Sequence, residues 1–159
     1  MTTATAHRPP RVGDVAPDFS LNSTSGQRFT LSSLRGRRAA LLAFFPLAFS
    51  SVCTVEMCDF GSGFEDFVGL DVEVLPISVD SVYTLREFKA KHHLPFDLLS
   101  DFKRDVSREY GVLLEDKFYS NRAYFLVDRD GTIRWAHVEA APGLKRDNRE
   151  LLEQIAALR

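Results

Sequence analysis

Two short, predominantly apolar runs stand out from the pattern of hydrophobic and polar positions along the chain. They cover residues 39–45 and 72–80 and are rich in aliphatic side chains. Runs of this length and composition are typical of strands that are buried on both faces. Pro76 lies inside the second run and has no N–H to donate, which predicts a bulge or a sheet edge there.

A helical spacing follows the first of these strands. Apolar side chains recur at steps of three and four residues, which predicts one buried face of a helix. Its members are Met57, Phe60, Phe64 and Phe67. Gly61 and Gly63 interrupt this helix, and each costs about 1 kcal/mol relative to alanine. We therefore expect the helix to be kinked or weakly held near its middle.

The remaining elements alternate in type along the chain. Turn residues and caps set their limits, notably Ser25-Gly26, Ser81, Gly111 and Asp130-Gly131. We expect a hairpin within 16–34, a helix at 81–94, a short strand at 96–101, a short helix at 104–112, a hairpin at 122–139 and a closing helix from 145.

This order predicts the α/β class, with a central mixed β-sheet flanked by helices on both faces and an N-terminal β-hairpin. Parallel strands come early in the chain and an antiparallel hairpin comes late. We expect a single domain over residues 11–159, preceded by a flexible tail at residues 1–10.

Charge and composition narrow the function classes. The chain has 159 residues, 26% of them charged, and a formal net charge of −2, which argues against nucleic-acid or anionic-membrane binding. No apolar run approaches the roughly 20 residues that span a bilayer. The first ten residues lack the pattern of a secretory signal. Two cysteines in such a chain predict a reducing compartment, the cytoplasm, and a catalytic or redox role for the pair.

Cys53 is the first candidate for chemistry. Pro46 ends the strand at 39–45, and Ser50 and Ser51 are good helix caps, so Cys53 falls in the first turn of the following helix. The unpaired N–H groups and the positive end of the dipole at a helix N-terminus favour a thiolate over a thiol. The sequence therefore predicts an activated cysteine.

Residues 46–53 also match the pattern P-x-x-x-[TS]-x-x-C between a strand and a helix. This pattern resembles the active-site signature of peroxiredoxins, which have a thioredoxin-like fold. APDF at 16–19, LLSD at 98–101 and NRAYFLVDRDG at 121–131 occur in the order that the family uses. FFPLAF is similar to the alkyl hydroperoxide reductase E type, and CTVEMC to the bacterioferritin comigratory protein (Q-type) group.

The resemblance implies a thiol-dependent peroxidase for hydrogen peroxide and organic hydroperoxides, with no metal or organic cofactor. By the motif, Cys53 is the nucleophile that becomes a sulfenic acid. Ser50 reaches the thiolate and the peroxide, and Pro46 shields them from water. Arg122 favours the thiolate and steadies negative charge, and Glu56 holds the arginine by a bidentate pair.

Each role has a structural alternative. The sequence alone is also compatible with Arg122 as an exposed strand residue and with Ser50 as a helix cap without a catalytic role. Glu56 fits a carboxylate that the helix dipole favours in a first turn. Cys53 itself fits an inert buried cysteine.

Cys58 is the candidate resolving residue, which would form a disulfide with Cys53. On an intact helix, five residues rise about 7.5 Å, so the two Cα atoms lie roughly 8–9 Å apart, beyond the ~7 Å that a disulfide spans. Thr54, Val55 and the Gly61/Gly63 pair make unwinding cheaper than in an alanine-rich helix. Resolution by Cys58 after local unfolding, resolution by an external thiol, and a silent core Cys58 all stay open.

The sequence gives less direct information about the substrate and the partners. Phe45, Leu47 and Phe49 lie near Cys53 in sequence, which makes an apolar pocket for organic hydroperoxides plausible. Family members use a thioredoxin-like or low-molecular-weight thiol reductant, and we expect a homodimer.

Other functions fit the sequence less well. A thioredoxin-type disulfide oxidoreductase has two residues between its cysteines, whereas four intervene here. A Cys–His hydrolase or a zinc site would need His92, His93 or His137 near a cysteine. A catalytically inactive binding module of the same fold would not require the Pro, Ser, Cys and Arg set.

Overall fold

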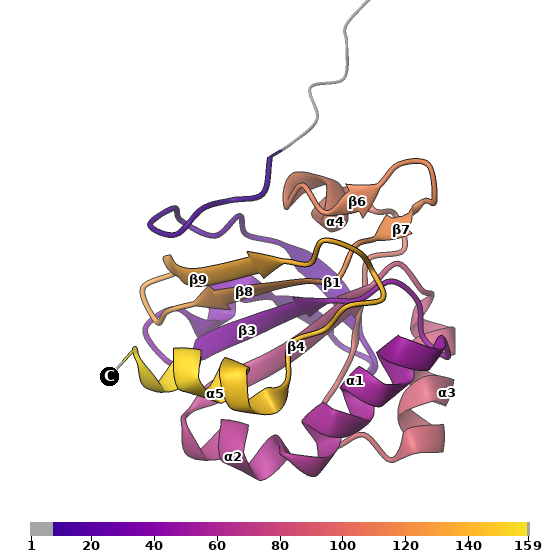
Figure 1. The fold of residues 1–159 in the computed structure, drawn as a ribbon, viewed down its shortest axis with the longest axis horizontal. Helices are drawn as coiled ribbons and strands as arrows, with labels where there is room; N and C mark the ends of the chain where they lie inside the picture. The colour runs from indigo at the N-terminus through magenta and orange to yellow at the C-terminus, as the bar shows by residue number, and fades with distance from the viewer. Residues whose placement is uncertain (1–7, 159) are drawn as a thin grey trace, which may run out of the picture.

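A seven-stranded mixed sheet forms the centre of the computed structural model, which describes residues 8–158 (Figure 1). Residues 1–7 of the predicted tail lie outside the described residues. The strand order is β2-β1-β5-β4-β3-β8-β9. The strands are β1 (Ser20–Ser23), β2 (Arg28–Thr30), β3 (Ala39–Phe44), β4 (Val72–Ser78), β5 (Leu99–Ser100), β8 (Ala123–Val127) and β9 (Ile133–Val138). Strands β3, β4 and β5 are parallel to one another, and the other pairs are antiparallel, which confirms the predicted mixed sheet.

Helices cover both faces of this sheet. One face packs against α1 (Ser51–Ser62), α2 (Phe64–Gly69), α3 (Val82–His92) and α5 (Asn148–Ala156) (Figure 1). The other packs against the 3₁₀ helix η1 (Leu31–Leu34) and α4 (Asp105–Glu109). A small ribbon, β6 (Leu113–Leu114) paired with β7 (Tyr119–Ser120), lies beside α4. No helix within the described residues is both long and apolar enough to cross a membrane.

Strand β3 contributes side chains to both halves of the core. Leu41 and Ala43 belong to the cluster under α1, α2, α3 and α5, whereas Leu42 and Phe44 belong to the cluster on the opposite face. Successive side chains on a strand point to opposite faces, so a strand covered on both sides needs apolar residues throughout. This requirement explains the apolar run in the sequence and leaves the end of β3 rigidly held.

The predicted helix break and cap are present. Helix α1 ends at Ser62, and Gly63 separates it from α2. Ser81 caps α3 by accepting a hydrogen bond from the N–H of Thr84 at 3.2 Å. The predicted hairpin at Asp130-Gly131 joins β8 to β9.

The prediction for Pro76 is wrong, because β4 is an internal strand. It pairs with β3 from Val72 to Ile77 without a register shift. On its other side it pairs with β5 only through Ile77 and Ser78. Pro76 therefore lies outside the short β4–β5 ladder, where a missing N–H costs little.

Candidate active site

The connection between β3 and α1 holds the candidate nucleophile. Pro46 follows the end of β3 and is buried, and Ser50 is the N-cap residue of α1 in an extended conformation. Cys53 is the third residue of the helix, as the sequence predicted, and its side chain is only 1% exposed. Phe49, just before the cap, has a left-handed φ of 69°, a strained value for a bulky residue. The sulfur therefore lies at a helix N-terminus beneath a tightly constrained loop.

Three contacts fix this loop in place. The carboxylate of Asp80 accepts a hydrogen bond from the N–H of Ala48 at 2.7 Å. The hydroxyl of Ser50 donates to the carbonyl of Leu47 at 2.7 Å, so in this structure it turns to the loop rather than to the sulfur. Ser120, from β7, donates to the carbonyl of Phe45 at 3.0 Å.

Arg122 is the group that contacts the sulfur. It precedes β8, and its Nη2 lies 3.0 Å from Cys53 Sγ. Its side chain is 1% exposed, so the contact is removed from bulk solvent. A guanidinium keeps its charge and favours the thiolate form of a sulfur that it contacts. The alternative of an exposed strand arginine therefore does not describe this chain.

Glu56 neutralises Arg122 from one turn further along α1. Its Oε1 accepts from Nη1 of Arg122 at 2.6 Å, and its side chain is 2% exposed. The predicted bidentate pair is wrong, because the other carboxylate oxygen, Oε2, accepts from Tyr124 instead. Burial raises the pKa of Glu56, and the neighbouring Arg122 and Tyr124 oppose that rise. Burial alone would lower the pKa of Arg122, but the charges of Glu56 and Cys53 outweigh it and the net shift is upward. Glu56 thereby holds the protonated guanidinium of Arg122 in place beside the sulfur.

Two further contacts to this pair were not predicted. The carbonyl of Pro142 accepts from Nε and Nη2 of Arg122 at 3.3 and 3.1 Å. The hydroxyl of Tyr124 donates to Oε2 of Glu56. A backbone acceptor leaves no trace in the sequence, but Tyr124 stands two positions after Arg122, and alternation along a strand puts both on one face. That spacing could have indicated the second contact.

The remaining predicted residues lie in different surroundings. Cys58 is exposed on α1, and both cysteines are free thiols. Leu47 and Phe49 are 36% and 45% exposed, whereas Phe45 is fully buried in the core. His92 is the last residue of α3, and His137 pairs with Glu139. The cationic side chain that contacts the sulfur is Arg122.

The arrangement as a whole places a cysteine sulfur, a permanent cation and hydrogen-bond donors within one buried site. Such a site suits attack on a substrate whose oxygen takes up negative charge as a bond breaks.

Comparison with protein families gives one match to most of the chain. The model described as the AhpC/TSA family matches residues 12–136. Alkyl hydroperoxide reductase E of Mycobacterium tuberculosis (strain ATCC 25618 / H37Rv) is 40% identical over 149 residues, which cover 92% of this chain and 97% of the relative. The chloroplastic 2-Cys peroxiredoxin BAS1 of Hordeum vulgare is 33% identical over 159 residues, which cover 94% of this chain and 75% of the relative.

Solved structures give the same picture. The reduced 2-Cys peroxiredoxin of Plasmodium vivax superposes with a TM-score of 0.87 at 32% identity, covering 94% of this chain and 82% of the other. Peroxidoxin BcpB of Mycobacterium tuberculosis superposes with a TM-score of 0.83 at 27% identity, covering 93% and 97%.

Proposed function

The chain belongs to the AhpC/TSA family and is a thiol-dependent peroxidase, and on this premise we propose that Cys53 is the sulfur that attacks the peroxide. The observation that carries this assignment is the 3.0 Å contact between Cys53 Sγ and Nη2 of Arg122 inside a buried site. The other cysteine, Cys58, is exposed and has no such cation beside it among the described contacts.

The proposed first step is a displacement at oxygen. The Cys53 thiolate attacks the terminal oxygen of the hydroperoxide, an S–O bond forms, and the O–O bond breaks. Sulfur is oxidised to sulfenic acid, while the departing oxygen is reduced and leaves as an alkoxide or hydroxide. A proton converts that anion to alcohol or water.

Arg122 would stabilise this transition state. Its guanidinium has five N–H donors, and the described residues accept from four of them: two go to Pro142, one to Glu56 and one to Cys53. The fifth, on Nη1, is left for a peroxide oxygen. Hydrogen-bond donors fixed where charge develops lower the barrier without reorganising.

Ser50 and Pro46 are proposed to complete the site. The Ser50 hydroxyl lies one turn before the sulfur, and rotation away from Leu47 would let it donate to a bound peroxide. Pro46 is buried at the end of β3, where it would exclude water from the thiolate. Exposed Leu47 and Phe49 on the same loop would favour organic hydroperoxides with apolar chains, while buried Phe45 would support the loop from below.

The assignment is tested by trapping the oxidised sulfur. We expect one equivalent of hydrogen peroxide, in the presence of dimedone, to add the trap to Cys53 and not to Cys58. The measurement is peptide mass spectrometry of the reduced protein after a brief reaction. Dimedone found first on Cys58 would contradict the assignment.

Cys58 is the proposed resolving residue. Condensation of the Cys53 sulfenic acid with the Cys58 thiol would form a disulfide and release water. Both residues lie within α1, so this step requires the first turns of the helix to unwind. Support comes from exposed Cys58 and from the break of the helix at Gly63.

We expect a Cys53–Cys58 disulfide after one equivalent of peroxide without trap or added thiol, detected by mass spectrometry of the non-reduced protein. The Cys58→Ser variant is the matched control and should keep its sulfenic acid. A wild-type sulfenic acid that persists as long as in this variant would reject Cys58 as the resolving residue.

The reducing partner and surroundings are proposed on the same grounds. A thioredoxin-like protein or a low-molecular-weight thiol would reduce the disulfide and restore both thiols. Two free cysteines in a reductant-dependent cycle fit the cytoplasm. A homodimer is supported by the outer edge of β9, which ends the strand order among the described residues.

A further inference from the structure

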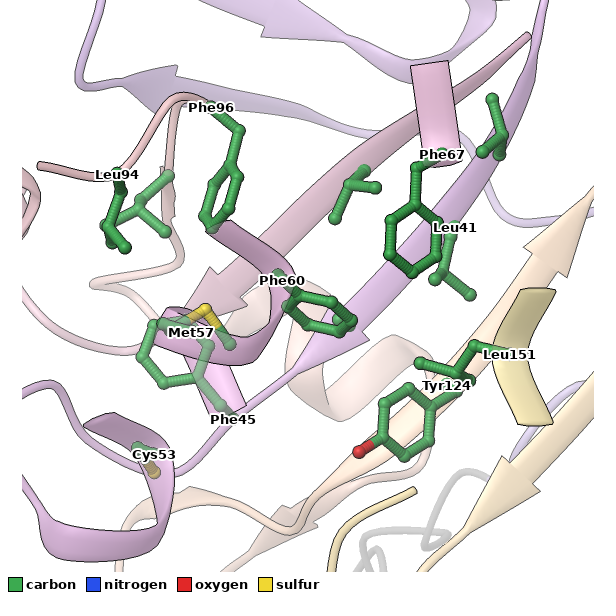
Figure 2. Close-up of a cluster of buried hydrophobic side chains, with 14 of the residues drawn as sticks. Leu41, Phe45, Cys53, Met57, Phe60, Phe67, Leu94, Phe96, Tyr124 and Leu151 are labelled. Carbon is green, nitrogen blue, oxygen red and sulfur yellow. The ribbon is translucent and has the colours of Figure 1, made fainter. Parts of the chain in front are cut away.

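Tyr124 contacts Glu56 at the active site, but the reaction described above gives it no role. It lies on β8, two residues after Arg122, and its ring is fully buried in the core cluster that also contains Cys53 (Figure 2). Its hydroxyl donates to Oε2 of Glu56 and accepts from the N–H of Arg146 at 3.0 Å. A buried phenol that is satisfied on both sides, with one side at the active site, has a defined orientation.

We propose that Tyr124 is a positioning residue for peroxide reduction, which keeps Glu56 ionised and aligned so that Glu56 in turn holds Arg122 on Cys53. The proposal rests on the assignment of Cys53 as the nucleophile. Tyr124 touches neither the sulfur nor the peroxide, so it acts only through the carboxylate.

The geometry of Glu56 carries the first step. Each carboxylate oxygen accepts one strong donor, Oε1 from Arg122 and Oε2 from Tyr124. The side chain is 2% exposed, so water cannot easily replace a lost donor. A buried carboxylate that loses one of two donors becomes easier to protonate. Removing the Tyr124 hydroxyl therefore favours neutral Glu56.

The orientation of the hydroxyl carries the second step. The backbone N–H of Arg146 donates to the phenol oxygen, so the hydrogen of the phenol is directed to Glu56. Burial raises the pKa of Tyr124, and the charge of Glu56 raises it further, so the phenol remains a donor at all pH values at which the enzyme works. Tyr124 thus cannot take over the negative charge from Glu56.

Neutral Glu56 would no longer fix Arg122. A protonated carboxyl group keeps one acceptor oxygen but loses the charge that makes the pair strong. The strong contacts to the guanidinium would then be those to the carbonyl of Pro142 and to the thiolate, with only a neutral hydrogen bond left to Glu56. Its remaining Nη1 donor would not be aimed at the peroxide, so the reaction with peroxide would slow although a thiolate is still present.

Other charged groups around Glu56 set the background for this effect. Lys145 lies close enough to oppose the upward shift of the Glu56 pKa, but its Nζ is 2.9 Å from Asp59. The side chain of Arg146 turns away to Glu139 and Glu150. These cations are paired elsewhere, which leaves Tyr124 and Arg122 as the donors that contact Glu56.

The test compares two buried tyrosines. We expect Tyr124→Phe to move the acid limb of the pH–rate curve for oxidation by hydrogen peroxide upward by about one pH unit, which is a tenfold lower rate on that limb. The rate above the limb should change little, because Glu56 ionises there without help. The curve for alkylation by iodoacetamide, which needs only the thiolate, should not move with it.

Tyr110→Phe is the matched control. Tyr110 is also fully buried, and its hydroxyl donates to the carbonyl of Pro17 at 2.6 Å on the opposite face of the sheet. It should leave both curves in place. In a Glu56→Gln background, Tyr124→Phe should add no further change to the peroxide curve. Equal curves for the two tyrosine variants, or an undiminished effect in the Glu56→Gln background, would overturn the proposal.

The wild-type protein gives a second measurement that does not depend on a variant folding. The buried hydroxyl proton of Tyr124 should be visible by NMR, and its shift should change with the same midpoint as the acid limb of the peroxide curve. A different midpoint would overturn the proposal. Trapping by dimedone keeps the two hypotheses apart: if Cys53 is oxidised but the tyrosine variants behave alike, only the role of Tyr124 fails.

Discussion

Replacing Cys53 by serine is expected to lower the rate of peroxide consumption by about 10⁴-fold or more, as the loss of a catalytic nucleophile does in other enzymes. A serine hydroxyl stays protonated near neutral pH and does not form a sulfenic acid, so the O–O bond has no attacking group. Serine is close to cysteine in size, and the site sits in a closely packed cluster, so we expect the variant to fold. The measurement is hydrogen peroxide loss with an excess of dithiol reductant.

The control for this experiment is Cys58→Ser, which removes the exposed thiol and leaves the buried one. It should keep the rate of Cys53 oxidation, measured by stopped flow with one equivalent of peroxide. Equal consumption by wild type and Cys53→Ser would remove the assignment of Cys53, because the oxidation would then occur elsewhere on the chain.

The burial of Cys53 shapes what its neighbours can do. A charge–charge contact strengthens where water is excluded, so a guanidinium at 3.0 Å would stabilise a buried thiolate more than an exposed one. The exposed parts of the site are Leu47, Phe49 and Ser50, all on the loop before α1. A peroxide would therefore approach the sulfur past this loop, and its side chains would be the first to select among substrates.

The sheet was predictable because its strands carry strong local signals. The apolar run of β3 and the Asp130-Gly131 turn each fix an element without reference to the rest of the chain. Pro76 misled the prediction because the cost of a missing N–H depends on whether a neighbouring strand reaches it, and β5 is only two residues long. The β6–β7 ribbon was missed because strands of two residues have no period to detect.

The site was also predictable only in part: the sequence identified its residues but not their contacts. The motif around Cys53 identified Ser50 and Glu56, and the NRAYFLVD segment identified Arg122, but neither could orient the side chains. The Ser50 hydroxyl turns to the loop, and Arg122 is also held by the carbonyl of Pro142. Contacts to a backbone atom 20 residues away depend on how the β9–α5 segment folds back over the site. No local sequence pattern predicts the path of this segment.

Arg122→Met is the second large effect that we expect. It should lower the rate of Cys53 oxidation by about 10²- to 10³-fold, because it removes the donors aimed at the developing charge. It should also lower the free energy of unfolding by about 3–5 kcal/mol, because the buried carboxyl group of Glu56 loses its cation and must either stay charged in the interior or take up a proton. The measurements are stopped-flow oxidation by peroxide and unfolding in urea.

The two effects separate in a double variant. Adding Glu56→Gln to Arg122→Met removes the stranded charge and should restore much of the lost stability while leaving the oxidation rate low. Arg122→Lys should lie between wild type and Arg122→Met in rate, because an ammonium keeps the charge but cannot bridge Glu56, Cys53 and Pro142 at once. If the double variant regained its rate together with its stability, Arg122 would act on the fold alone and the transition state would need another donor.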